Sequence, residues 1–350
     1  MSKTIHALRL LTSTVSAWVV VVLCAVLVIG LKASNPWTGH VAVLPYQSPA
    51  DTRLVSDDNP LGGNGFYVDP NSSAAGAARQ AAPPSAELQS IAQTPQARWL
   101  TETTPTDQTA GAVAAYIGAA AAANAMPVIV LYALPHRDCG SFTAGGFSSG
   151  DEYRAWVAQV AAGVGKARVG VVLEPDALTA ADCLPGDERQ ERTALLRDAV
   201  GALTANPNAA VYVDGGHSRW LTPDQLADRL RAVGVERARG FALNTSNFFT
   251  TDEEIGYGEA VSRLLDGAHY VVDTSRNGAG PAPDAPLNWC NPAGRAIGAS
   301  PTTATAGAHA DAYLWIKHPG ESDGECGRGD PPSGVFMPGY AAALVRTAKG

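Results

Sequence analysis

Acidic and aromatic residues follow apolar runs at several points of this 350-residue sequence. Asp176 comes just after the run 171–173, and Asp214 comes directly after the run 210–213, with Trp220 close behind it. Carboxyl groups act as general acids and bases where burial and neighbouring charges move their pKa values apart. Tryptophan rings stack on the C–H faces of sugars, and carboxylates and amides bind hydroxyl groups. Together these residue types suggest a carbohydrate-binding cleft.

Seven short runs rich in β-branched and other apolar residues predict strands. They cover residues 98–100, 126–134, 169–173, 210–213, 240–243, 270–272 and 312–316. The stretches between most of them carry apolar residues at helical spacing, which predicts helices. These helices are expected over 111–123, 151–164, 188–203, 222–233 and 251–265, two of them capped by Ser149 and Thr250.

Strands that alternate with helices predict a mainly parallel sheet, and their regular spacing favours an α/β barrel. No G-x-G-x-x-G or other glycine-rich nucleotide loop follows the first strand. Parallel folds of this kind bind ligands at the carboxyl ends of their strands. The residues expected at that rim are Trp99, Tyr132, Glu174, Asp214, Asn244, Asp273 and Lys317.

The composition excludes several classes of protein. Apolar residues make up 46% of the chain and charged residues 17%, which excludes disorder throughout. The 36 glycines and 24 prolines indicate many tight turns and exclude helical bundles and coiled coils. The net charge is −8 and no long basic run is present, so we expect no nucleic-acid partner.

The N-terminus carries a possible membrane segment. Lys3 and Arg9 precede an uncharged run over 10–31, which is long enough to cross a bilayer and ends at Lys32. We expect residues 1–32 to form an uncleaved anchor, with a long cleaved signal peptide as the alternative. In either case the rest of the chain is expected to be extracytoplasmic, secreted or anchored to the membrane. Residues 33–63 are expected to be a linker and residues 64–350 the catalytic domain.

Four cysteines lie outside the apolar run: Cys139, Cys183, Cys290 and Cys326. They have no C-x-x-C spacing and no histidine pair at zinc-ligand distance, so we expect neither a metal nor a cofactor. An even set of cysteines in an exported chain predicts two disulfides.

Several blocks of the sequence are similar to glycoside hydrolase family six, the cellulases that comprise endoglucanases and cellobiohydrolases. The resemblance is collinear from Phe66 almost to the C-terminus, over about 280 of the 350 residues. It rests on the blocks 137–140, 174–176, 216–218, 244–247, 273–278, 288–290 and 317–323. The family implies a distorted seven-stranded parallel barrel and hydrolysis of β-1,4-glucan with inversion at the anomeric carbon.

The resemblance implies roles for three carboxyl groups. Asp176 is expected to be the general acid, and Asp138 to order the water and modulate Asp176. From residue type alone, Asp138 could equally form a structural pair with Arg137. Asp323 is the expected base, with a water relay toward Asp138 as the alternative. Where relatives carry a serine near this water, the present chain has Thr143 or Ala144.

The resemblance also implies substrate-binding residues. They are Tyr132, Trp99, Asp214, Trp220, Asn244, Trp289, Lys317 and Glu321. Trp315 lies at a strand end and is a further candidate for stacking. His217 is expected to bond locally, and Asp273 and Arg276 to form an ion pair beneath the site.

The family pairing implies the disulfides Cys139–Cys183 and Cys290–Cys326. Short connections after Asn247 and over 323–335 favour an open cleft and internal cuts in the glucan, by a protein expected to be a monomer. A hydrolase of another envelope polysaccharide, a noncatalytic glycan-binding protein and an anchored scaffold are the alternatives.

Overall fold

The computed structural model describes residues 59–349. The expected membrane segment, residues 1–32, and most of the expected linker, residues 33–63, lie outside this range. Among the described residues, no helix combines the length and the apolar character needed to cross a bilayer.

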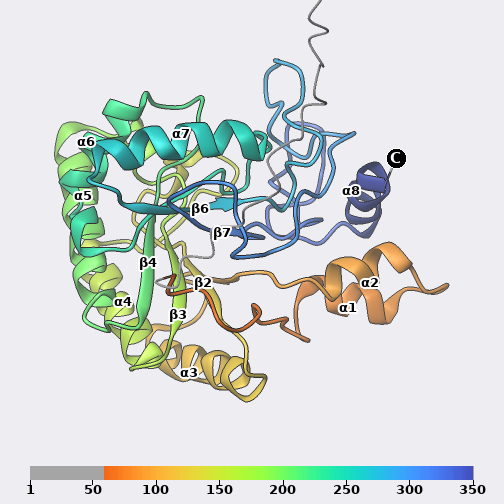
Figure 1. Ribbon diagram of the computed structural model, residues 1–350, viewed down its shortest axis with the longest axis horizontal. Helices are drawn as coiled ribbons and strands as arrows, with labels where there is room; N and C mark the ends of the chain where they lie inside the picture. The colour runs from red at the N-terminus through yellow and green to blue at the C-terminus, as the bar shows by residue number, and fades with distance from the viewer. Residues whose placement is uncertain (1–58, 350) are drawn as a thin grey trace, which may run out of the picture. The chain divides into compact units, whose positions relative to one another are not determined.

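The seven predicted parallel strands are confirmed, and they form one curled sheet in the order of the sequence, a half-barrel rather than the predicted barrel (Figure 1). They are β1 (Arg98–Leu100), β2 (Val128–Leu131), β3 (Val169–Leu173), β4 (Ala209–Asp214), β5 (Gly240–Leu243), β6 (His269–Asp273) and β7 (Ala310–Leu314). The ladder runs from β1 to β7, and the two outer strands are not paired with each other in the described chain. Just beyond them, Ala97 N donates to Trp315 O at 3.0 Å, so the two edges still approach each other.

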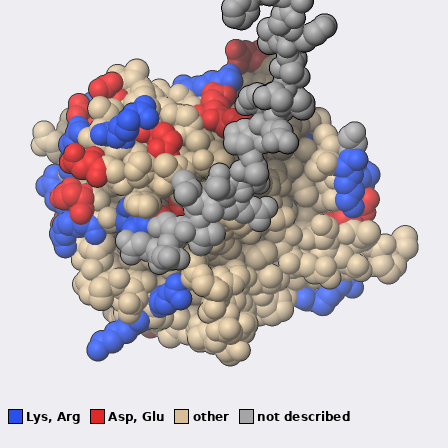
Figure 2. Space-filling model, viewed as in Figure 1, with Lys and Arg blue, Asp and Glu red and all other residues tan. Residues whose placement is uncertain are grey.

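Five helices return the chain between strands on the outside of the curled sheet (Figure 1). They are α3 (Thr106–Ala122), α4 (Gly150–Val164), α5 (Gly186–Leu203), α6 (Pro223–Ala232) and α7 (Thr251–Leu264), close to the predicted ranges. The predicted caps are confirmed, because the side chain of Ser149 accepts from Glu152 N and that of Thr250 accepts from Glu253 N. Figure 2 shows charged side chains gathered over the α5 and α6 side of the molecule.

Both faces of the sheet bury apolar side chains, so each face contributes to the hydrophobic core. Ile129, Leu131, Val171 and Leu173 pack against the helices. The alternate residues of the same strands, such as Val130 and Val172, pack against Tyr212, Ala242 and Leu314 inside the curled sheet. Because both faces are buried, the strands are continuous apolar runs rather than alternating ones.

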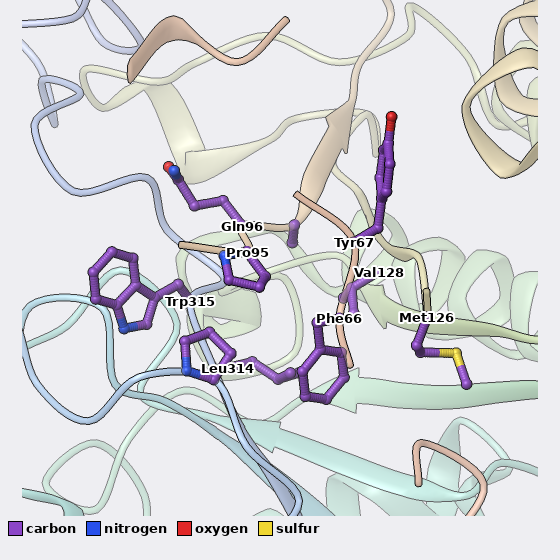
Figure 3. A pocket seen from close by; sticks show the side chains of 10 residues that line it. Phe66, Tyr67, Pro95, Gln96, Met126, Val128, Leu314 and Trp315 are labelled. Atoms are coloured by element: carbon purple, nitrogen blue, oxygen red, sulfur yellow. The ribbon is translucent and has the colours of Figure 1, made fainter. Parts of the chain in front are cut away.

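The sequence patterns did not predict three terminal helices, α1 (Ser73–Gln80), α2 (Ala86–Ala92) and α8 (Pro338–Lys349). They bury a small apolar cluster that includes Trp315, which is 2% exposed and donates from Nε1 to Ala299 O. The expectation that Trp315 stacks on a ligand at the rim was therefore wrong. Figure 3 shows Trp315 near Pro95, beside a cavity of about 10 Å³ that has room for about one water molecule and no sugar.

Candidate active site

The loops that follow the strands hold the predicted carboxyl groups in unusual backbone conformations. Asp138 (φ 51°), Glu174 (φ 51°) and Asp176 (φ 67°) all lie in the left-handed region, which is rare for residues other than glycine. Conformations of this kind cost about 1 to 3 kcal/mol each and cluster at functional sites. The local strain agrees with the prediction that these loops form the site.

Asp176 has the environment of a carboxyl group that keeps its proton. Its backbone N–H donates to Asp214 Oδ1 at 3.0 Å, and its own Oδ1 is buried without a hydrogen-bond partner in the described chain. Burial raises the pKa of Asp176 well above its usual value, and the nearby charges of Asp214 and Asp138 raise it further. A protonated carboxyl group at neutral pH is suited to donate a proton.

Asp214, one of the predicted substrate-binding residues, is fully buried next to Asp176, and its contact with substrate stays a prediction. Its Oδ1 accepts from the backbone N–H of Asp176 and of Gly216, each at 3.0 Å. Burial raises the pKa of Asp214 to about 6. Asp214 therefore fixes the Asp176 loop and also disfavours the ionised form of Asp176.

Asp138 begins a short 3-10 turn, η1 (Asp138–Gly140), and its side chain accepts hydrogen bonds from two hydroxyl groups. The hydroxyls of Tyr132 and Thr143 both donate to its Oδ2. Burial raises the pKa of Asp138, although these two hydrogen bonds oppose the shift. Of the two residues considered for the serine position, Thr143 is the one whose hydroxyl contacts Asp138.

The side chain of Arg137 interacts with residues other than Asp138. Its Nη1 lies 2.7 Å from Glu102 Oε2 in an ion pair, and its Nε donates to Thr143 O. The structure therefore argues against the alternative in which Asp138 serves only as the ionic partner of Arg137. Glu102 was not predicted, and nothing in its sequence context marked it.

Asp323 is buried between two cations. Arg276 Nη1 lies 2.8 Å from Oδ2 and Lys317 Nζ lies 3.4 Å from Oδ1, while Asn291 N donates to Oδ2. Burial opposes ionisation of Asp323, but the charges of Arg276 and Lys317 outweigh it and lower the pKa. Asp323 is therefore held as an anion.

The expected ion pair between Asp273 and Arg276 is not found in the described chain, because Arg276 pairs with Asp323 instead. Asp273 instead accepts from backbone N–H groups of Ser246, Ser275 and Lys317, at 2.9 to 3.0 Å. It thereby fixes the loops after β5, β6 and β7.

The predicted aromatic residues differ in exposure. Trp220 is 40% and Trp289 39% exposed, so both can present a ring to a ligand. Trp99 is half-buried and meets the ring of Tyr132 edge to face at 5.1 Å. Phe142 was not predicted; it is 39% exposed and its ring lies 6.1 Å from that of Trp289.

His217 and Asn244 bond within the protein. The ring of His217 stacks on Phe249, its Nδ1 accepts from Arg219 N, and burial lowers its pKa to about 4. This local role was predicted. The Asn244 amide bonds the backbone of Phe249 and Asp273. Asn244 therefore joins the loop after β5 to the end of β6, and its predicted contact with substrate stays a prediction.

The two predicted disulfides, Cys139–Cys183 and Cys290–Cys326, are confirmed. The bridged cysteines are 44 and 36 residues apart in the sequence. Each disulfide should raise the free energy of unfolding by about 4 kcal/mol if it acts by constraining the unfolded chain. Cys139 directly follows Asp138, so the first bridge ties the Asp138 loop to η2 (Thr179–Cys183), which follows Asp176. Within residues 59–349, no group of three or more His, Cys, Asp or Glu side chains could hold a metal ion.

Buried carboxyl groups and exposed tryptophans in the segments that follow the strands of a curled parallel sheet are the arrangement expected of a carbohydrate-cleaving α/β enzyme. The chain belongs to the glycosyl hydrolases family 6, whose model matches residues 61–348.

Several relatives support this assignment. Endoglucanase A of Cellulomonas fimi is 43% identical over 288 residues, which are 82% of this chain and 62% of that protein. Endoglucanase 1 of Streptomyces halstedii is 41% identical over 81% of this chain and 88% of that protein. The chain thus spans less than two thirds of the Cellulomonas relative but most of the Streptomyces one.

Among solved structures, the endoglucanase Cel6 from Mycobacterium tuberculosis, bound to methyl-cellobiosyl-4-deoxy-4-thio-β-D-cellobioside, is 64% identical. It superposes with a TM-score of 0.83 over 83% of this chain and 100% of that chain.

Proposed function

We propose that this protein is an endo-β-1,4-glucanase that hydrolyses cellulose or a related β-1,4-glucan with inversion. The observation that carries the proposal is the half-buried carboxyl group of Asp176, whose Oδ1 has no hydrogen-bond partner in the described chain. Burial and the nearby charges of Asp214 and Asp138 raise the pKa of this carboxyl group. Family membership and the oligosaccharide-bound relative support a glucan as the substrate.

In the proposed mechanism, Asp176 donates its proton to the oxygen of the bond that breaks. A water molecule attacks the anomeric carbon from the opposite face, which inverts the configuration. Trp220 and Trp289 are proposed to stack on glucosyl rings, and Tyr132 to contact the sugar at the cleavage point. Lys317 and Glu321 are proposed to form hydrogen bonds with glucan hydroxyls. Lys317 would do so while its ammonium group stays paired with Asp323.

We propose that Asp138 is the base and that the attacking water passes its proton to Asp138 through a water relay. Asp323 has a lowered pKa because Arg276 and Lys317 stabilise its charge, so it accepts a proton less readily than Asp138, whose pKa is raised. Asp323 is then the fixed negative charge that stabilises the positive charge developing on the sugar. This assignment reverses the predicted preference for Asp323 as the base.

An assay on soluble substrate tests the activity. The full-length chain, kept in mild detergent because of the apolar run 10–31, is expected to lower the viscosity of carboxymethylcellulose while few reducing ends have formed. Nuclear magnetic resonance of early products is expected to show α-anomers. Cellobiose release without viscosity loss would contradict internal cutting, and cleavage of only another envelope polysaccharide would favour that alternative.

We also propose that the catalytic part works outside the cytoplasm, anchored or secreted through residues 1–32. The two disulfides support this, because such bonds persist in oxidising compartments. Acid-quenched protein from cells, denatured without reductant, is expected to bind one thiol reagent per chain, at Cys24, or none if the segment is cleaved. Modification of all five cysteines would contradict the proposal.

A further inference from the structure

A cavity of about 210 Å³ lies at the Trp99 end of the proposed cleft. Its wall includes Ser73, Arg98, Trp99, His318 and Glu321. The side chains of His318 and Glu321 are only 17% and 14% exposed, so both are largely shielded from solvent. His318 was not among the predicted site residues.

His318 lies between two groups that only accept hydrogen bonds. Its Nε2 is 2.6 Å from the carbonyl oxygen of Ala97, and its Nδ1 is 2.9 Å from Glu321 Oε1. A neutral imidazole has a proton on one nitrogen, and therefore could satisfy only one of these acceptors. The geometry requires both nitrogens to donate, which is the imidazolium form.

The same carboxylate oxygen receives a second donor. Ser73 Oγ donates to Glu321 Oε1 at 2.7 Å, so both protein donors converge on this one atom. No group within residues 59–349 makes a hydrogen bond to Oε2 of Glu321. The hydrogen bonds to Oε1 fix the orientation of the Glu321 carboxylate. Oε2 can therefore accept a hydrogen bond from a ligand in the cavity.

Several charged groups set the protonation of His318. Burial disfavours its charge and Lys317 opposes it, but Glu321 and the Ala97 carbonyl outweigh both and raise its pKa. Burial opposes ionisation of Glu321, but His318, Lys317 and Ser73 lower its pKa. Asp69 and Arg98 also line the cavity and form an ion pair in which Arg98 Nη1 lies 3.5 Å from Asp69 Oδ2.

We propose that His318 is a positioning residue: as an imidazolium it fixes the carboxylate of Glu321 so that Oε2 binds a glucan hydroxyl at the Trp99 end of the cleft. This inference rests on the proposed function and adds a residue and a pH dependence to it. Because the pKa of His318 is raised, the pairing is complete at acidic pH and is lost as the pH rises through that pKa. Affinity for the glucan should fall over the same range.

The variants His318→Leu and His318→Gln test the proposal in the full-length chain. We expect KM for cellohexaose at pH 6 to rise about tenfold in His318→Leu, the loss of one charge-assisted hydrogen bond, with kcat within about twofold. His318→Gln keeps one donor and is expected to recover part of this loss. In the wild type KM should rise with pH, and in both variants that dependence should be absent.

Two further variants separate positioning from folding. Ser73→Ala removes the other donor to Oε1 and is expected to raise KM less while the pH dependence remains. His309→Leu breaks a second histidine–glutamate pair, His309 Nδ1 to Glu259 Oε2 at 2.7 Å, and should leave KM unchanged.

The outcomes are distinguishable from those for the proposed function. An active wild type whose KM does not respond to His318→Leu, or whose pH dependence survives His318→Gln, would overturn the inference alone. A wild type that cleaves no glucan would overturn the proposed function, and this inference with it.

Discussion

Replacing Asp176 by Asn is expected to lower kcat on carboxymethylcellulose by about 10² to 10⁴-fold, the range that a general acid contributes. The substitution keeps the volume of the side chain and the backbone bond from Asp176 N to Asp214 Oδ1. Affinity for cellohexaose, measured by calorimetry, should therefore change little. A variant with near wild-type kcat, or one that no longer binds the oligosaccharide, would contradict the assigned role.

The pH dependence gives a second measure of the same proton. The general acid acts only while protonated, and the pKa of Asp176 is raised, so activity should persist below that pKa and fall as the pH rises through it. Asp214→Asn removes a neighbouring negative charge and should lower the pKa of Asp176. The alkaline limb of kcat/KM is then expected to move to lower pH, and an unmoved limb would show that Asp214 does not act on Asp176.

The sequence predicted the parts of the fold that depend on local patterns. Long buried strands such as 169–173 and capped helices such as the one after Ser149 are defined by residues near one another in the chain. The helices α1, α2 and α8 were missed because α1 and α2 are short, and because their apolar residues face one another across a long sequence separation.

The predicted site was incomplete for a related reason. Residue type and position marked Asp138, Asp176 and Asp323, but the partners of Asp176 and Asp323 lie at or after the ends of other strands. The ion pair of Arg276 with Asp323 joins residues 47 positions apart, and the bond from Asp176 N to Asp214 Oδ1 joins residues 38 apart. Likewise, Trp315 ends a strand but faces the terminal helices, and the strand pattern alone could not give that direction.

Replacing Arg276 by Met is expected to lower the free energy of unfolding by about 3 to 5 kcal/mol at pH 7, because it leaves a buried carboxylate without its main partner. The Arg276 side chain is fully buried, donates to Asp323 Oδ2 and to Ser246 O, and lies over the ring of Phe248 at 4.3 Å. Lys317 remains, but its ammonium is 3.4 Å from Asp323 and is also shared with Ser322 O. Unfolding by urea, followed by tryptophan fluorescence, measures the effect.

The sign of the pH dependence distinguishes this electrostatic cause from lost packing. In the wild type the pKa of Asp323 is lowered, so its ionisation stabilises the fold above the unfolded-state pKa, and this stabilisation is lost as the pH falls through the folded-state pKa. Without Arg276 that pKa should rise, so Asp323 can take up a proton at moderately acidic pH. The destabilisation of Arg276→Met should therefore be smaller at pH 4.5 than at pH 7, and packing alone would give the same loss at both.

Two matched variants complete the test. Arg276→Met combined with Asp323→Asn removes the uncompensated charge and should recover part of the stability at pH 7. Its activity is expected to be low, because the proposed fixed negative charge of Asp323 is gone. Arg154→Met breaks an exposed pair with Asp198 at 2.8 Å and should cost at most about 1 kcal/mol. If the double variant were less stable than Arg276→Met, the cost would lie in packing around Phe248, and Asp323 would not depend on Arg276 for its charge.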